Sequence, residues 1–119
     1  MHTVLITGAV QSNFVRSVAA AACRLGLECH AQLGALGYVL AAKEISGQLA
    51  EQNLVFDEIV VASGSGSTHS GLLFGLRSLG CETRVTGVCV RREAPAQIKR
   101  IQSHLKNIAG LLRSSNPVT

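Results

Sequence analysis

Short apolar runs alternate along this chain with segments whose apolar residues recur at helical spacing. The apolar runs cover residues 3–6, 28–33, 58–62 and 84–90, and the third, Glu-Ile-Val-Val-Ala, is the strongest predicted strand. Strands that alternate with helices in this way are typical of βα units. The pattern therefore predicts an α/β fold, built on a parallel sheet with helices on both faces.

Four segments carry the helical spacing, namely residues 14–25, 36–50, 71–79 and 98–112. Gly26 and Gly80 follow the first and the third of them, at the place of a C-cap glycine. In the last segment the basic residues lie off the apolar stripe. We therefore expect an amphipathic helix with a basic outer face at the C-terminal end.

Length and composition agree with one domain. The chain has 119 residues, of which 47% are hydrophobic, 15% charged and 3% aromatic. This gives room for one core made of Ala, Val, Leu and Ile, and it argues against disorder. We interpret residues 1–113 as a single α/β domain, and we expect residues 114–119, which contain Pro117, to fray.

The charge of the chain is moderately basic, with 11 Lys and Arg against 7 Asp and Glu, and the excess lies mostly in residues 91–113. A nucleic-acid surface also needs stacking side chains, and the chain has one Tyr and no Trp. We expect a solvated basic helix face, with no nucleic-acid or membrane partner. No signal peptide and no bilayer-spanning apolar run is present, so a cytoplasmic location is expected.

The four cysteines form no C-x-x-C pair, so neither a metal nor a redox site is indicated. Cys23 falls on a helical pattern and Cys89 in a strand pattern. Both are interpreted as small apolar core residues.

The loop after the strongest strand is the first candidate site. Residues 63–69 read Ser-Gly-Ser-Gly-Ser-Thr-His, and a predicted helix follows. Backbone N–H groups at such a helix start bind phosphate, and Gly64 and Gly66 let the backbone approach an anion closely. The predicted donors therefore include the hydroxyls of Ser65, Ser67 and Thr68.

Two nucleotide-binding motifs are excluded at this loop. No Lys follows its last glycine, as a Walker A loop requires, and His69 stands where the third glycine of G-x-G-x-x-G should be. An ordinary βα turn with a Ser or Thr N-cap remains the alternative to an anion site.

The second candidate is Gly-Ala-Val-Gln-Ser-Asn at residues 8–13, which also lies between a strand and a helix. Ligands of open α/β sheets bind at the edge where such loops meet. Gln11, Ser12 and Asn13 can donate hydrogen bonds to a carboxylate or a ring oxygen. Taken alone, Ser12 is better explained as an N-cap.

Three segments in order resemble one family: residues 8–16, the Leu-Gly-Tyr-Val of residues 36–39, and the Ala-Ser-Gly-Ser-Gly-Ser-Thr-His-Ser-Gly of residues 62–71. They are similar to the D-cysteine desulfhydrase and 1-aminocyclopropane-1-carboxylate deaminase family, which uses pyridoxal phosphate and has the tryptophan synthase β fold. The resemblance runs over residues 4–112. It implies a partial tryptophan synthase β-like fold.

The resemblance also implies roles for single residues. Gly64, Ser65, Gly66, Ser67 and Thr68 would hold the cofactor phosphate. Asn13 would meet the pyridoxal ring oxygen, and Gln11, Ser12 and Asn13 would receive the carboxylate of a small amino-acid substrate such as D-cysteine.

The chain departs from the family in four places. Phe14 stands where the family has His or Gln, and no Lys precedes Gln11 to match the family's Schiff-base lysine. The family's C-terminal tyrosines have no counterpart. Several dozen family residues are also missing between residues 28–33 and 36–39, where Gly34 and Ala35 form the direct connection. The catalytic residue is therefore unassigned, and the chain is expected to be shortened at both ends and internally.

Two functions follow as hypotheses. The first is a pyridoxal-phosphate-dependent lyase or deaminase, in which a Schiff base with the amino acid allows proton removal. The second is a non-catalytic phosphate-binding or assembly module. An imine-forming lysine would separate them, but Lys43, Lys99 and Lys106 lie on predicted helices and are read as solvated. Since missing segments leave sheet edges and apolar surface open, we expect a homo-oligomer.

Overall fold

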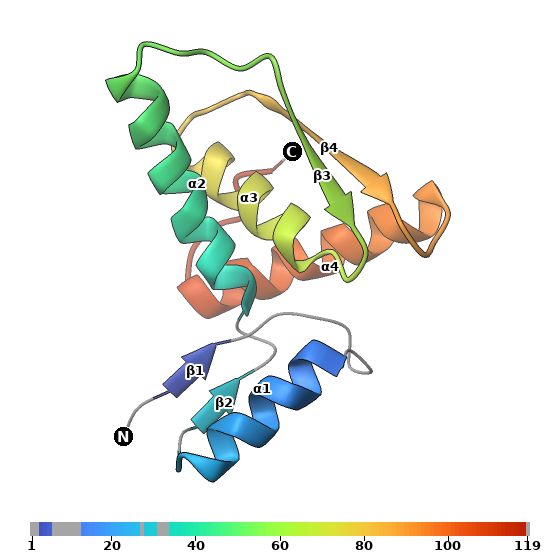
Figure 1. Ribbon diagram of the computed structural model, residues 1–119. Coiled ribbons are helices and arrows are strands. Elements are labelled where there is room, and N and C mark those ends of the chain that lie inside the picture. The colour runs from blue at the N-terminus through green and yellow to red at the C-terminus, as the bar shows by residue number, and fades with distance from the viewer. Residues whose placement is uncertain (1–2, 6–12, 27, 31–33, 119) are drawn as a thin grey trace.

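Figure 1 shows the computed structural model, which describes residues 3–5, 13–26, 28–30 and 34–118. Strands and helices alternate along the chain, as predicted. In order they are β1 (Thr3–Leu5), α1 (Asn13–Arg24), β2 (Glu28–His30), α2 (Gly34–Glu51), β3 (Glu58–Ser63), α3 (Ser67–Ser78), β4 (Arg84–Cys89) and α4 (Ala94–Leu112). The predicted α/β class is confirmed.

The strands do not form the one sheet that we expected. Within the described residues, β1 pairs with β2 and β3 pairs with β4, both in parallel, and the two pairs are separate sheets. β1 and β2 have three residues each, so their ladder is short. Their main helical contact is α1 on β2, whereas α3 contacts β3 and β4.

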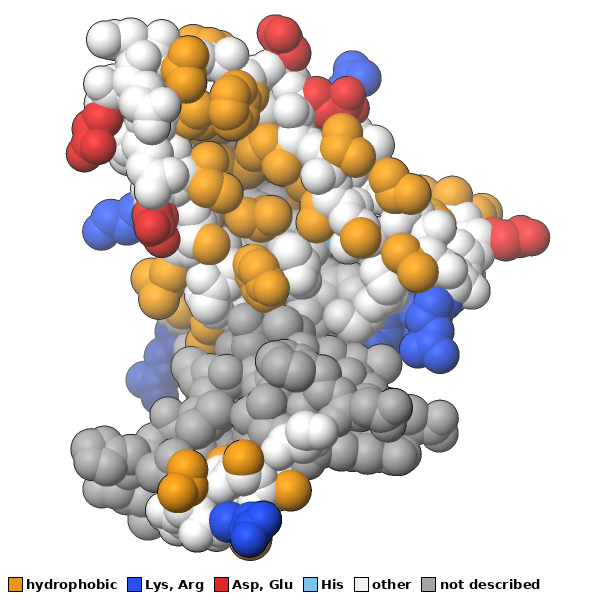
Figure 2. Space-filling view, viewed as in Figure 1, with side chains coloured by type: hydrophobic (Ala, Val, Ile, Leu, Met, Phe, Trp, Pro, Cys, Tyr) orange, Lys and Arg blue, Asp and Glu red, His pale blue; other side chains and the backbone are white. Residues whose placement is uncertain are grey.

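The two faces of the β3–β4 sheet differ, which corrects the prediction of helices on both. Ile59, Val61 and Val85 pack on a buried cluster of Ala42, Leu72 and Leu76 from α2 and α3. On the opposite face Val60 is 63% exposed and Val88 is 54% exposed. Figure 2 shows apolar side chains on the side of the molecule where β3 and β4 lie in Figure 1. The alternation of strands and helices suggested two covered faces, but the described helices cover one.

Two glycines let α3 approach α2 closely. A Cβ atom on Gly71 would lie 2.4 Å from the carbonyl oxygen of Ala35, and one on Gly75 would lie 2.6 Å from Cβ of Ala42. These glycines are one helical turn apart, so they form a smooth stripe for α2. The contact aligns α3, and with it the loop that precedes α3.

α4 completes the core from the other side of α3. Its residues Ile101, Leu105 and Ile108 are buried with Phe74 of α3 and Ala35 of α2. Val118 of the C-terminal segment packs against this cluster. The predicted apolar stripe of the last helix is thus confirmed at these three residues, whereas Ile98 and Leu112 at its ends are exposed. Lys99 and Lys106 are exposed off the stripe. None of the helices in the described residues is long and apolar enough to cross a membrane.

Some boundaries and burials differ from the predictions. α3 begins at Ser67, four residues before the predicted start at Gly71, and α4 begins at Ala94, with Pro95 in its first turn. Both helices open with residues that carry no apolar spacing, which is why the pattern missed their starts. The interpretation of Cys23 and Cys89 as core residues is wrong, since both are exposed.

Candidate phosphate-binding site

The candidate loop is a tight connection between β3 and α3. Ser63 ends β3, and Gly66 is the N-cap of α3 with a left-handed φ of 90°. The Gly66 carbonyl accepts a hydrogen bond from the Ser70 backbone N–H (2.9 Å) and another from the Ser70 hydroxyl. Because a left-handed φ suits glycine, Gly66 fixes the point where the helix starts.

The start of α3 keeps donors available. Gly66 has no side chain to cap the first turn, and no side-chain cap hydrogen bond is present. The Ser65 hydroxyl approaches the N–H of Ser67 at a long 3.4 Å. First-turn N–H groups of a helix carry a positive partial charge, so the start of this 12-residue helix agrees with the predicted anion site, which stays a prediction.

The space around the loop is uneven. A Cβ on Gly64 would meet no atom within 4 Å, whereas one on Gly66 would lie 3.0 Å from Cδ1 of Ile101 and 3.2 Å from Cδ2 of His104. The loop is therefore packed against α4 at Gly66 and open at Gly64. The structure places Ser67 and Thr68 in the first turn of α3 rather than in a loop.

Side chains from α4 and the residues before it hold two carbonyls of the loop. The Gly64 carbonyl accepts hydrogen bonds from Arg92 Nη1 (3.0 Å) and Gln97 Nε2 (3.2 Å). The Ser65 carbonyl accepts one from Arg100 Nε (2.5 Å), and His104 Nε2 lies 3.0 Å from the same oxygen. Two guanidinium groups thus lie beside the loop.

A buried polar network lies beneath the end of β3. Ser63 is 1% exposed, and its Oγ lies 3.0 Å from Nδ1 of His69 and 2.9 Å from Nε2 of Gln97. Burial lowers the pKa of His69 below its ordinary value of 6.5, and a hydrogen bond with the Val85 backbone opposes this in part. Nδ1 of His69 and the Ser63 hydroxyl thus share a hydrogen bond, whose direction depends on the imidazole tautomer.

The buried side chain of Gln97 leaves one polar atom without a hydrogen bond in the described residues. It is 4% exposed, and its Oε1 has no hydrogen-bond partner in the part of the chain that the structure describes. Its amide orientation is set by the Gly64 carbonyl, which can only accept and so requires Nε2 on that side. A buried unsatisfied acceptor costs about 1–3 kcal/mol, so the contacts of Nε2 must compensate.

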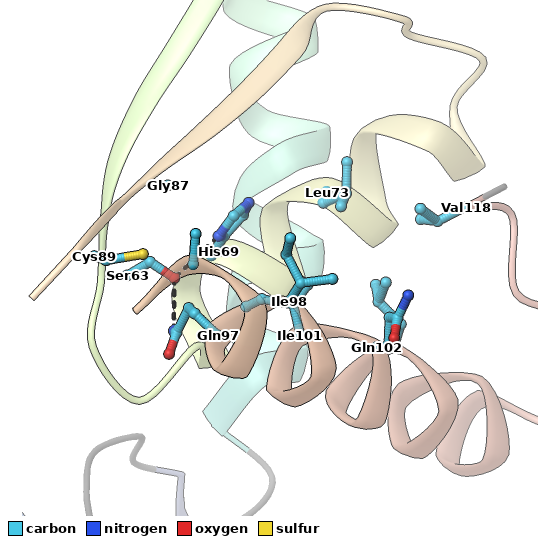
Figure 3. A pocket seen from close by; sticks show the side chains of 12 residues that line it. Ser63, His69, Leu73, Gly87, Cys89, Gln97, Ile98, Ile101, Gln102 and Val118 are labelled. Atoms are coloured by element: carbon cyan, nitrogen blue, oxygen red, sulfur yellow. Dashed lines mark hydrogen bonds between the residues drawn. The ribbon is translucent and has the colours of Figure 1, made fainter. Parts of the chain in front are cut away.

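A cavity of about 380 Å³ adjoins this network (Figure 3). Ser63, His69 and Gln97 form its polar end, while Leu73, Ile98 and Leu105 are among the apolar side chains that line the rest. The three lysines of the chain do not line it, and all are exposed, Lys43 on α2 and the other two on α4. No lysine therefore lies in this cavity.

The structure describes only the last residue of the predicted substrate loop at residues 8–13. Gln11 and Ser12 lie outside the described residues, and Asn13 is the first residue of α1 with a side chain that is not described. That the two loops meet stays a prediction. Sequence reasoning did miss Gln97 and His104. Gln97 lies one turn before Ile101 on the apolar stripe, and a polar residue at such a position could have indicated a buried role.

Comparison with known proteins identifies relatives that are named D-cysteine desulfhydrase. A D-cysteine desulfhydrase of Serratia proteamaculans is 45% identical over 80 residues, which are 67% of this chain and 24% of the relative. One from Salmonella paratyphi C gives the same identity and coverage. One from Yersinia enterocolitica is 30% identical over 185 aligned positions, covering 98% of this chain and 56% of the relative. No family model matches the chain.

The coverage agrees with the internal shortening expected from the resemblance. The alignment with the Yersinia enterocolitica protein is 66 positions longer than this chain of 119 residues, so that relative contains internal segments without a counterpart here. The chain spans between 24% and 56% of the length of these curated relatives. The predicted family is confirmed by these matches: the chain belongs to the D-cysteine desulfhydrase family and corresponds to a part of its members.

Proposed function

We propose that the chain supplies the phosphate-binding part of a pyridoxal-phosphate-dependent enzyme that acts on D-cysteine or a similar small amino acid. The observation that carries the proposal is the first turn of α3, whose N-cap Gly66 has no capping side chain, beside the open position at Gly64, in a chain of this family. The phosphate would be held by backbone N–H groups of Gly64, Ser65, Gly66, Ser67 and Thr68 and by the loop hydroxyls.

The residues present fit the phosphate but not the whole cofactor site. Pyridoxal phosphate, when bound, supplies the electron sink for removing a proton from an amino acid. The loop binds and orients its phosphate. The Schiff-base lysine has no match, because Lys43, Lys99 and Lys106 are all exposed on helices. The catalytic residue therefore stays unassigned.

The remaining expectations belong to the same proposal. Gln11, Ser12 and Asn13 would bind the substrate carboxylate, and Asn13 the pyridoxal ring oxygen. The fold would be part of a tryptophan synthase β-like domain, the substrate could extend to 1-aminocyclopropane-1-carboxylate, and the protein would act in the cytoplasm as a homo-oligomer. The alternative, a non-catalytic phosphate-binding or assembly module, stays the second candidate for the chain acting alone, because its three lysines are exposed.

Cofactor titration tests the proposal. Adding pyridoxal phosphate should raise the melting temperature, because a ligand that binds only the folded state stabilises it. Gly64→Val should abolish this rise without lowering the melting temperature of the free chain, since its side chain meets only open space. Gly47→Val, also in open space but on α2, is the matched control.

Two results would speak against it. The first is an unchanged melting temperature at millimolar pyridoxal phosphate or inorganic phosphate. The second is an equal rise in Gly64→Val, which would place the ligand elsewhere. Borohydride treatment at one equivalent of pyridoxal phosphate separates the two candidate functions. A stable adduct at one lysine favours the enzyme, whereas no adduct, or labelling spread over the three exposed lysines, favours the binding module.

A further inference from the structure

The carbonyl groups of the loop determine where its N–H groups point. All peptide bonds in the described residues are trans, and in a planar trans peptide the N–H points away from the preceding carbonyl. The Gly64 carbonyl faces Arg92 and Gln97, so the N–H of Ser65 points away from them. The Ser65 carbonyl faces Arg100 and His104, so the N–H of Gly66 also points away from α4.

We infer that Gln97 and Arg100 of α4 are positioning residues for the phosphate-binding loop. They donate hydrogen bonds to the carbonyls of Gly64 and Ser65. These bonds orient the N–H groups of Ser65 and Gly66 toward the phosphate. The inference rests on the proposed function. It extends that function to a helix whose contacts lie 33 to 39 residues beyond the loop in sequence.

Three features support a positioning role. Gln97 is buried and joins Ser63 Oγ and the Gly64 carbonyl through one nitrogen, so it ties the strand end to the loop. Gly66 packs on Ile101 and His104, which leaves the loop little freedom to move toward α4. The Arg100 guanidinium also polarises the peptide between Ser65 and Gly66, which strengthens that N–H as a donor.

The test measures the dissociation constants of pyridoxal and of pyridoxal phosphate for the full chain. The constant for pyridoxal divided by the constant for pyridoxal phosphate gives the contribution of the phosphate to binding. Gln97→Met and Arg100→Met remove the donors while keeping side-chain length. Each should lower the ratio about tenfold, the size of effect expected from losing one hydrogen bond. Gln102→Met and Lys99→Met are matched controls on the exposed part of α4, and Lys99→Met removes the same charge as Arg100→Met. Both should keep the wild-type ratio.

The outcomes are separable. A wild-type ratio near one refutes the proposed function, and the inference with it. A wild-type preference for pyridoxal phosphate that both variants retain refutes the inference alone. Should the variants fail to fold, the amide NMR spectrum of the wild type decides. Inorganic phosphate should shift the Ser65 and Gly66 amides most, and a largest shift at the Arg92 or Arg100 side chains overturns the inference.

Discussion

Gly87 of β4 makes room for the hydrogen bond between His69 and Ser63. A Cβ atom on Gly87 would lie 2.4 Å from Nδ1 of His69 and 2.9 Å from Cβ of Ser63. The same Nδ1 lies 3.0 Å from the Ser63 hydroxyl. The absence of a side chain on one strand therefore allows a contact between the neighbouring strand and the first turn of α3, next to the candidate phosphate-binding loop.

Gly87→Ala should destabilise the protein. β4 is fixed by its pairing with β3, so the new methyl group must displace the imidazole and break its contact with Ser63. Overpacking of this kind costs about 1–3 kcal/mol. Urea denaturation measures the loss. Gly110→Ala is the control, because Gly110 lies in α4 with open space around it and the change should stabilise by up to about 1 kcal/mol. Equal stability of the two variants would contradict the expected clash.

The protein should lose stability as the pH falls below about 6.5, the ordinary pKa of histidine. Burial lowers the pKa of His69, and a hydrogen bond with the Val85 backbone opposes this in part. Burial also lowers the pKa of His104. A hydrogen bond with the Ser65 backbone opposes that shift, and the charge of Arg100 adds to it. At a pH between the pKa of the folded state and that of the unfolded state, the unfolded chain binds more protons. The contribution of these histidines to the free energy of unfolding is therefore complete above the unfolded-state pKa, and it is lost as the pH falls through the folded-state pKa.

Urea midpoints at pH 8 and pH 5 check this expectation. His69→Gln and His104→Gln should each reduce the difference between the two midpoints, and the double variant should reduce it most. A difference that is unchanged in the double variant would assign the acid sensitivity to other groups.

The local parts of the fold could be predicted from sequence, and the long-range parts could not. Apolar spacing gave the alternation of strands and helices, because burial of one face imposes it. The separate pairing of β1–β2 and β3–β4 depends on which segments meet in space, and apolar runs do not encode this. The start of α3 at Ser67 was missed because residues 67–70, Ser-Thr-His-Ser, carry no apolar spacing.

The candidate site shows the same division. The loop at residues 63–68 was recognisable because glycine and serine between a strand and a helix have a direct physical meaning. Its support by Gln97 and Arg100 was not, because these side chains read as ordinary polar residues of an amphipathic helix. Their role arises from packing of α4 against α3, which brings them to carbonyls more than 30 residues away.

The chain should associate in solution. The outer face of the β3–β4 sheet exposes Val60 and Val88, and parallel sheets are normally covered on both faces. Val60→Lys and Val88→Lys should shift the mass measured by light scattering toward the monomer. Leu111→Lys, at an exposed position on α4, serves as the control. A wild-type chain that stays monomeric at high concentration would refute the expectation.

The chain alone should not turn over D-cysteine at a rate near that of a complete family member, even if it binds the cofactor. The family resemblance implies a lysine that holds the cofactor and moves the proton, and the three lysines here are exposed on α2 and α4. A positioned general base typically contributes about a hundred- to ten-thousand-fold in rate, and correct orientation of the reactants contributes more. Phe14, which has no side-chain donor, should weaken binding of the substrate carboxylate further.

Sulfide and pyruvate release from D-cysteine measures this directly, with saturating pyridoxal phosphate and with the free cofactor in buffer as the blank. We expect rates close to the blank, because phosphate binding at the loop orients the cofactor without supplying a base. Rates far above the blank that are abolished by Lys43→Ala, Lys99→Ala or Lys106→Ala would overturn the expectation. The lysine whose removal abolished them would then be the imine-forming residue.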